Sequence, residues 1–126
     1  MPSFKGASLH DVVKAFEAVA PLRLAESWDN VGLLVEPSSP HVVKRLMLTN
    51  DLTKPVLKEA LKTNCNLIFS YHPPIFTAFK RLVQKNVKQQ LVIQCIEEKI
   101  AVFSPHTSHD VVDGGVNDWL LAAFGK

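Results

Sequence analysis

The feature that most constrains the fold of this chain is a regular alternation of short apolar runs with longer amphipathic segments. Apolar runs cover residues 31–35, 42–49, 66–70 and 100–105, and their lengths are typical of strands. Strands that alternate with helices predict an α/β domain whose mostly parallel sheet is flanked by helices. At 126 residues the chain is expected to form a single α/β domain, residues 1–126.

Local motifs predict where the helices begin. Ser8 and Asp11 have the spacing of a helix start in which a hydroxyl caps a backbone N–H three residues on. Thr53 is predicted to cap a second helix, with a proline in its first turn where the ring costs little. Two further helices are expected at residues 82–98 and 116–124, and the run at 42–49 is expected to be one buried strand.

Composition narrows the class of protein. The formal net charge of +2 gives no evidence for a nucleic-acid partner, because such proteins usually carry a clustered basic patch. The two cysteines, Cys65 and Cys95, form no C-x-x-C pair and are expected to be inert buried thiols in a reducing compartment. We see no secretory signal and no apolar stretch that could span a bilayer, so we expect a protein of the cytoplasm and nucleus that is not secreted.

Three polar motifs follow the predicted strands, and they are the candidates for function. These motifs are "TNDLT", "SYHPP" and "SPHTSHD", after the second, third and fourth strands. Ligands of open parallel sheets bind outside the carboxyl ends of the strands. If the strands are parallel, the three motifs therefore meet at one edge of the sheet.

His72 and the histidines after the fourth strand are the candidate ligands. Pro73 holds His72 extended, which suits a metal ligand or a catalytic base, whereas the alternative is a structural loop with a hydrogen-bonded histidine. His106, His109 and Asp110 offer imidazole and carboxylate groups, the ligand set of zinc, iron or manganese. The alternative for that segment is a turn whose aspartates cap the last helix.

Two other aspartates have open roles. Asp51, in "TNDLT", is a candidate to orient an imidazole through a hydrogen bond, or else to cap the following helix. Asp29 and Asn30 are expected to form a turn before the first strand, and Trp28 packs either on the core or at an interface. The dinucleotide, phosphate-loop and nucleophile-elbow motifs of common enzyme classes are missing from the sequence.

Taken together, the motifs resemble those of the NIF-three-like family, and they resemble its eukaryotic-type members in particular. The resemblance covers nearly the whole chain and rests on "ESWDNVGLLV", "TNDLT", "LIFSYHPPIF" and "VFSPHTSHD" with "GGVNDWL". It implies one lobe, the N-terminal one, of an α/β protein with two similar lobes. It also implies a homo-oligomer, either a dimer or a toroidal hexamer, and a pair of divalent metal ions, with zinc, iron or manganese as candidates.

The resemblance assigns specific residues to that metal site. His72 matches the second histidine of the family's His-His-Pro motif, and Asp110 matches its ligating aspartate. His106 matches a nearby histidine that neighbours the metals. Tyr71 replaces the first histidine of the motif, and a phenol with a pKa of about 10 is a poor ligand at neutral pH. The His-x-x-x-Glu motif that supplies the remaining ligands is missing from the sequence.

These observations leave three hypotheses for function. The one we favour is an interaction protein associated with transcriptional coregulators that keeps a partial metal site, with Ile75, Phe76 and Phe79 as candidate contacts for protein partners. The alternative is a metal-dependent hydrolase of unknown substrate that requires a second lobe, in which case this chain alone is not expected to be active. The plainest is a structural lobe without activity. The altered motif also leaves open a chain that binds no metal.

Overall fold

A four-stranded sheet forms the centre of the fold in the computed structural model, which describes residues 5–125. Its strands lie in the order β2-β6-β5-β4, with bounds Gly32–Val35, Ala101–Ser104, Leu67–Ser70 and Leu46–Thr49. The strands β4, β5 and β6 are parallel, and β2 runs antiparallel to β6. The prediction of a mostly parallel α/β sheet is therefore confirmed.

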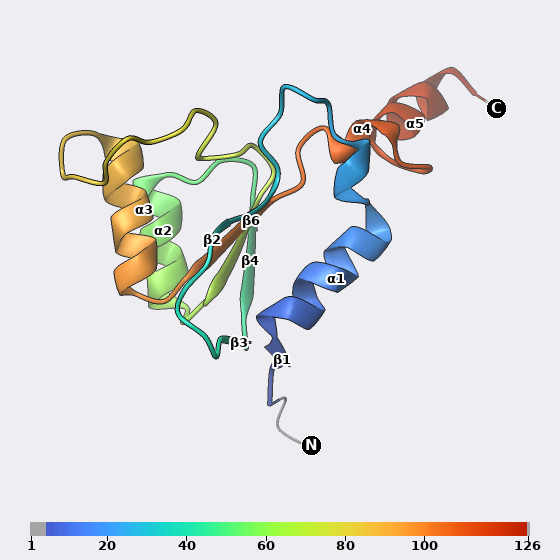
Figure 1. Cartoon of the computed structure of the whole chain (residues 1–126). Coiled ribbons are helices and arrows are strands. Elements are labelled where there is room, and N and C mark those ends of the chain that lie inside the picture. Colours follow the sequence, from blue (N-terminus) through green and yellow to red (C-terminus); the bar gives the residue numbers. More distant parts are fainter. Residues whose placement is uncertain (1–4, 126) are drawn as a thin grey trace.

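Helices cover both faces of the sheet (Figure 1). The helices α2 (Lys54–Lys62) and α3 (Val87–Glu97) lie on one face, and α1 (Leu9–Val19) lies on the other. The remaining elements are β1 (Ala7–Ser8) and β3 (Val42–Val43), which pair with each other, and the short helical segments η1 (Leu22–Leu24), α4 (Ser108–Val111), α5 (Val116–Leu121) and η2 (Ala122–Phe124).

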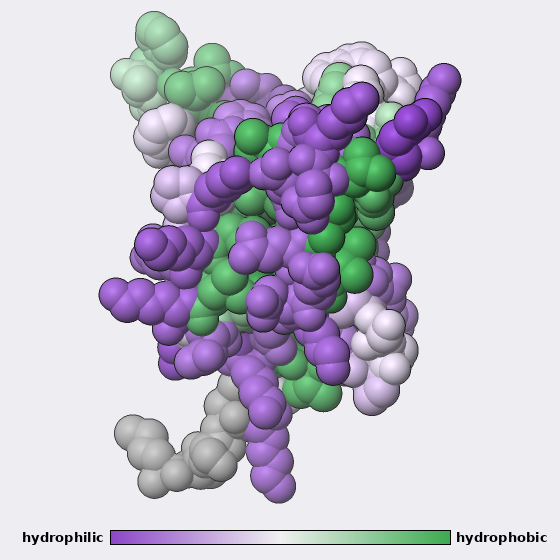
Figure 2. Space-filling view, turned by 90° about the vertical axis from the view of Figure 1, so that its left-hand side faces the viewer, coloured by the Kyte–Doolittle hydropathy of each residue, from purple (hydrophilic) through white to green (hydrophobic). Residues whose placement is uncertain are grey.

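Each face of the sheet has its own hydrophobic core. Leu57 of α2, Ile68 of β5 and Val102 of β6 are buried in the cluster under α2 and α3. On the other face, Phe103 of β6 is 1% exposed, and its ring centre lies 4.9 Å from that of Phe16 in α1. Figure 2 shows mainly hydrophilic side chains on the outer surface of the α2 and α3 layer, with apolar groups between them. Within residues 5–125, no helix combines the length and the apolar character that a bilayer crossing requires.

Both predicted helix caps are present. The Asp11 N–H donates to Ser8 Oγ at 3.1 Å, and the Val56 N–H donates to Thr53 Oγ1 at 3.4 Å. These bonds satisfy backbone donors that have no partner inside their helices. The caps fix the starts of α1 and α2, and α2 begins directly after the "TNDLT" motif.

The prediction of one buried strand over residues 42–49 is wrong. The segment forms β3 and β4, which belong to different sheets. The side chain of Asn66 stabilises the interruption between the two strands, because it donates to Val42 O at 2.6 Å and accepts from the Lys44 N–H at 3.0 Å. β4 lies at the edge of the sheet, and Leu48 is 71% exposed there. An apolar run therefore marked an edge strand, which periodicity alone does not distinguish from a buried one.

Two predicted helix boundaries also differ from the structure. α3 begins at Val87, because Asn86 accepts a hydrogen bond from the Gln89 N–H at 2.9 Å and caps the helix there. Residues 82–86 therefore belong to the preceding loop. The helix expected at residues 116–124 is present as α5 followed directly by η2, and a further short helix, α4, precedes it.

Candidate functional site

The polar motifs after β4, β5 and β6 meet at the carboxyl edge of the sheet, as their parallel order predicts. The ladder between β4 and β5 continues past both strands, since the Tyr71 N–H donates to Thr49 O and the His72 N–H to Asn50 O, each at 2.9 Å. Ser104 at the end of β6 donates its hydroxyl to Tyr71 O at 3.0 Å. The backbone that carries His72 is thus tied to both neighbouring strands.

Asp51 holds the ring of His72. Nδ1 of His72 lies 2.9 Å from Asp51 Oδ1, so the ring nitrogen donates to the carboxylate. Both side chains are more than half exposed, at 52% for His72 and 66% for Asp51. The expected pairing of Asp51 with an imidazole is present, and Thr53 caps α2 instead of Asp51.

Asp29 forms a second and more enclosed pair with His106. The Asp29 side chain is fully buried, and Nδ1 of His106 lies 2.9 Å from each of its two carboxylate oxygens. The Thr107 N–H donates to Asp29 Oδ2 at 3.1 Å, and Thr107 Oγ1 donates to the same oxygen. The Asn30 N–H donates to Asp29 Oδ1 at 2.8 Å, which is the turn that the sequence predicts.

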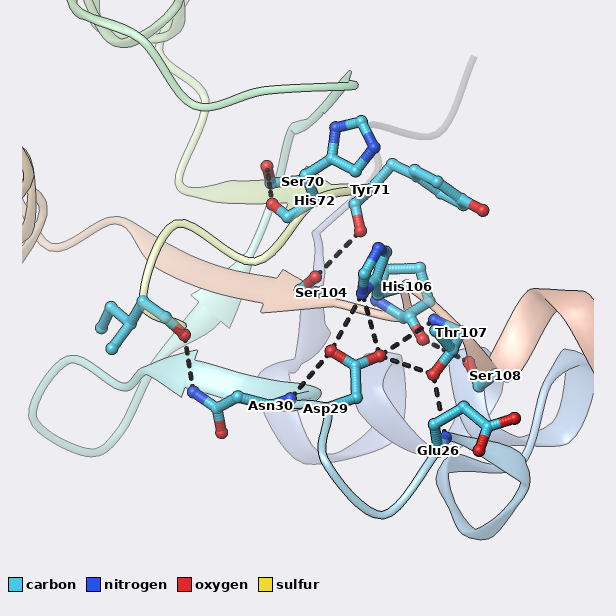
Figure 3. Close-up of polar contacts among 12 residues, drawn as sticks. Glu26, Asp29, Asn30, Ser70, Tyr71, His72, Ser104, His106, Thr107 and Ser108 are labelled. Atoms are coloured by element: carbon cyan, nitrogen blue, oxygen red, sulfur yellow. Dashed lines mark hydrogen bonds and ion pairs between the residues drawn. The ribbon is translucent and has the colours of Figure 1, made fainter. Parts of the chain in front are cut away.

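Figure 3 shows the Asp29–His106 pair together with the neighbouring side chains of Tyr71 and His72. The nitrogen of His106 that contacts Asp29 is on one side of the ring, and the other nitrogen is on the side toward Tyr71 and His72. The ring centres of His72 and His106 are 5.6 Å apart. The structure therefore brings two imidazoles together, each held through Nδ1 by its own aspartate.

The pairing of Asp29 with His106 was not predicted from the sequence. The two residues are 77 positions apart, and Asp29 precedes a strand that runs antiparallel to its neighbour, so the strand-end rule for parallel sheets does not include it. The one signal in the sequence was the motif "SWDN". A hydrogen bond within a local turn is enough to explain an aspartate at that position, so the motif did not indicate a distant partner.

Electrostatics at the site follow from these contacts. Burial alone would raise the pKa of the Asp29 carboxyl, but hydrogen bonds from His106, Thr107 and Asn30 outweigh it and hold the pKa below its usual value. Burial raises the pKa of the Tyr71 phenol, and the negative charges of Asp110 and Asp29 raise it further. Tyr71 is therefore a neutral phenol at physiological pH, which is unsuited to ligate a divalent ion.

Asp110 and His109 lie on α4, beside the histidine pair. The negative charge of Asp110 contributes to the raised pKa of Tyr71, and the centre of the His109 ring is 6.1 Å from that of Tyr71. Burial lowers the pKa of His109, although the charge of Asp110 partly offsets this effect. Among the described residues, Asp110 forms no side-chain hydrogen bond to His72 or His106, so its role as a ligand stays a prediction.

Aromatic side chains form the rim of the site. Trp28 is 60% exposed, and its ring centre lies 6.3 Å from both Phe76 and His106. Of the two alternatives for Trp28, packing on the core is thus not observed. The side chain of Asn30 donates to Ile75 O at 2.6 Å and ties this rim to the loop after the two prolines.

The residues present fit only part of a metal centre. In the stretch from residue 5 to residue 125, no three His, Cys, Asp or Glu side chains lie close enough together to hold one ion. Two imidazoles on one tetrahedral zinc, at a Zn–N distance of about 2.0–2.1 Å, have ring centres roughly 5 Å apart. The observed 5.6 Å between His72 and His106 is close to that spacing.

The cysteines lie away from this edge and are buried in the core under α2 and α3. Burial raises the pKa of Cys95 to about 12, so its thiolate is scarce at neutral pH. In a Cys65→Ser variant, we expect the thiol of Cys95 to react with N-ethylmaleimide at pH 7 at least 100-fold more slowly in the native than in the urea-unfolded protein. Comparable rates in the two states would contradict the burial of this thiol.

Comparison with known proteins shows the family. Residues 7–126 match the family model Duf34/NIF3 (NGG1p interacting factor 3). The chain is 51% identical over 123 residues to NIF3-like protein 1 of Drosophila melanogaster, covering 98% of this chain and 42% of that protein. It is 49% identical over 117 residues to NIF3-like protein 1 of Homo sapiens, covering 93% of this chain and 31% of that protein.

Solved structures agree with the sequence comparison. The crystal structure of a Bacillus cereus protein related to NIF3 superposes with a TM-score of 0.85 at 32% identity, over 97% of this chain and 33% of that one. Reduced HcgD from Methanocaldococcus jannaschii superposes with a TM-score of 0.82 at 27% identity, over 90% of this chain and 45% of that one. The chain spans less than half the length of each of these relatives, and it belongs to the Duf34/NIF3 (NGG1p interacting factor 3) family.

Proposed function

We propose that this chain, as one lobe of a longer protein, contributes His72, His106 and Asp110 to a centre for a pair of divalent metal ions at the carboxyl edge of its sheet, so that the three side chains need not share one ion. The observation that carries the proposal is the adjacent pair of imidazoles, each held through Nδ1 by an aspartate. Metal-binding histidines typically donate their second ring nitrogen to a carboxylate in this way. Zinc, iron and manganese are the candidate ions.

The remaining ligands are proposed to come from outside this chain. Structural zinc sites use four protein ligands, and the described residues bring no three candidate side chains around one point. The curated relatives are more than twice as long as the matched region, since the chain covers 42% of the Drosophila protein and 31% of the human one. A second lobe of such a protein, or another subunit of a dimer or hexamer, is the proposed source of the missing groups.

Metal content measured by mass spectrometry tests this proposal. We expect protein purified without a histidine tag and equilibrated with zinc to retain metal, and His72→Ala to lose most of it. His10→Ala is the matched control, because His10 is exposed on α1 and should bind no metal in this site. Metal content that is unchanged in His72→Ala, or reduced equally in His10→Ala, would refute the proposed site.

A role in protein interaction is the second candidate, and the exposed aromatic rim favours it. Phe76 is 45% exposed beside Trp28, whereas Ile75 and Phe79 pack against the core under α2 and α3. Of the three apolar residues expected as contacts, Phe76 is thus the one available to a partner. Association with transcriptional coregulators in the cytoplasm and nucleus remains a proposal that rests on the family resemblance.

Hydrolysis is the third candidate, and it requires the complete centre. A bound divalent ion would supply a water of lowered pKa as the nucleophile. In that case, this chain's part is to hold His72 and His106 in place through Asp51 and Asp29 and to keep Tyr71 as a neutral phenol beside them. The substrate of such a reaction is not indicated by any motif in the chain.

A further inference from the structure

We propose that Asp29 is the positioning residue of His106, which it fixes with the Nδ1 hydrogen inward and the Nε2 lone pair facing Tyr71 and His72. The orientation follows from the contacts of Asp29 alone. The use of His106 Nε2 as a metal ligand rests on the proposed function. The two parts can therefore fail separately.

The first step concerns the hydrogen on the ring. An ionised carboxylate only accepts hydrogen bonds, so a ring nitrogen 2.9 Å from both of its oxygens must carry the hydrogen. Both carboxylate oxygens also accept backbone N–H groups, from Asn30 at Oδ1 and from Thr107 at Oδ2, which is the acceptor pattern of an ionised carboxylate. When His106 is neutral, its Nε2 is then unprotonated and available as an acceptor or a ligand.

The second step concerns how firmly the carboxylate itself is held. Asp29 accepts hydrogen bonds from Asn30 on its own turn and from two groups of Thr107 on the loop after β6. Thr107 Oγ1 also accepts from the Glu26 N–H at 2.9 Å. The acceptor is therefore fixed by two segments before it meets the imidazole, which is the arrangement that locks a functional side chain in one orientation.

The third step concerns the backbone of His106. Its φ of +34° lies in the left-handed region, which residues with a Cβ rarely adopt. In this conformation the ring of His106 contacts Asp29 while Thr107, the next residue, donates to the same carboxylate. Unfavourable backbone angles that surrounding contacts hold in place are frequent at functional sites.

The two aspartate–histidine pairs at this edge are not equivalent. The side chain of Asp29 is fully buried and that of His106 is 22% exposed, whereas Asp51 and His72 are 66% and 52% exposed. Water therefore competes less for the hydrogen bond of the enclosed pair than for that of the exposed pair. We therefore assign His106 the fixed orientation and His72 the adjustable one.

Nitrogen-15 NMR of the histidine rings at pH 8 tests the proposal in the 126-residue chain. Five histidines give a resolvable set, and comparison with His106→Gln assigns the ring of interest. We expect the wild-type His106 ring to carry its hydrogen on Nδ1, which is the less common form of a free imidazole side chain. A ring with its hydrogen on Nε2 would overturn the proposal without any variant having to fold.

Two variants separate positioning from a merely structural role. Asp29→Asn places an amide donor against the ring, so we expect the hydrogen to move toward Nε2, as an Asp to Asn change does in the serine protease triad. Thr107→Val removes the hydroxyl bonds and leaves the carboxylate on His106, so we expect the Nδ1 form to persist. An equal change in both variants, or no change in Asp29→Asn, would refute the assignment.

Zinc titration of the same variants links the orientation to the site. Loss of a residue that orients a ligand typically costs about 10–100-fold in metal affinity. We expect that loss in Asp29→Asn and less than a threefold change in Thr107→Val. If the wild-type ring carries the Nδ1 hydrogen but no protein binds zinc, the proposed metal centre fails while the positioning role of Asp29 stands.

Discussion

Replacing Phe103 with alanine is expected to lower the free energy of unfolding by about 3–5 kcal/mol, as for other buried aromatic residues. Phe103 is 1% exposed in the centre of the sheet, and its ring packs against those of Phe16 and Phe69, with centre distances of 4.9 and 5.7 Å. The variant would leave a cavity that strands on both sides prevent from closing. Urea denaturation followed by circular dichroism measures the change.

Two further variants serve as controls for Phe103→Ala. Phe124→Ala removes an equally large ring that is 88% exposed, so we expect a change within about 0.5 kcal/mol. Phe103→Leu keeps most of the volume and should cost less than Phe103→Ala, which guards against a variant too unstable to measure. A cost below about 1 kcal/mol for Phe103→Ala would contradict the packing of α1 against the sheet.

Removing either imidazole of the pair is expected to weaken zinc binding by at least tenfold. The reason is that His72 and His106 are the two ligands brought to this point by the sheet, with ring centres 5.6 Å apart. When few protein ligands hold an ion, each ligand contributes a large fraction of the free energy of binding. Each single variant therefore removes a large fraction of that free energy. Calorimetric titration of zinc into His72→Ala and His106→Ala measures both losses.

The features that could be predicted from the sequence either depend on residues close together in the chain or follow from the parallel order of the strands. Ser8 and Thr53 were identified as caps because a cap depends on residues three positions apart. One of the two roles left open for Asp51, orienting an imidazole, could be inferred because its motif and that of His72 follow neighbouring parallel strands. In these cases, the physical cause of the contact lies within one motif or one topological rule.

The features that were missed depend on distant parts of the chain. The break between β3 and β4 is held by the side chain of Asn66, which lies on the far side of α2 in sequence. The contact of Asp29 with His106 requires the loop before β2 to fold under the end of β6, and β2 joins the sheet antiparallel. No periodicity or spacing in the sequence encodes either contact, so only the assembled structure shows them.

The measurement that tests the metal centre most directly is a double-mutant cycle for zinc affinity with His72→Ala, His106→Ala and the double variant. If both imidazoles bind one ion, the losses are coupled, and the double variant should be little weaker than the weaker single variant. We predict a coupling of at least tenfold between the two sites. Additive losses, or single variants that bind zinc like the wild-type chain, would contradict a centre shared by His72 and His106.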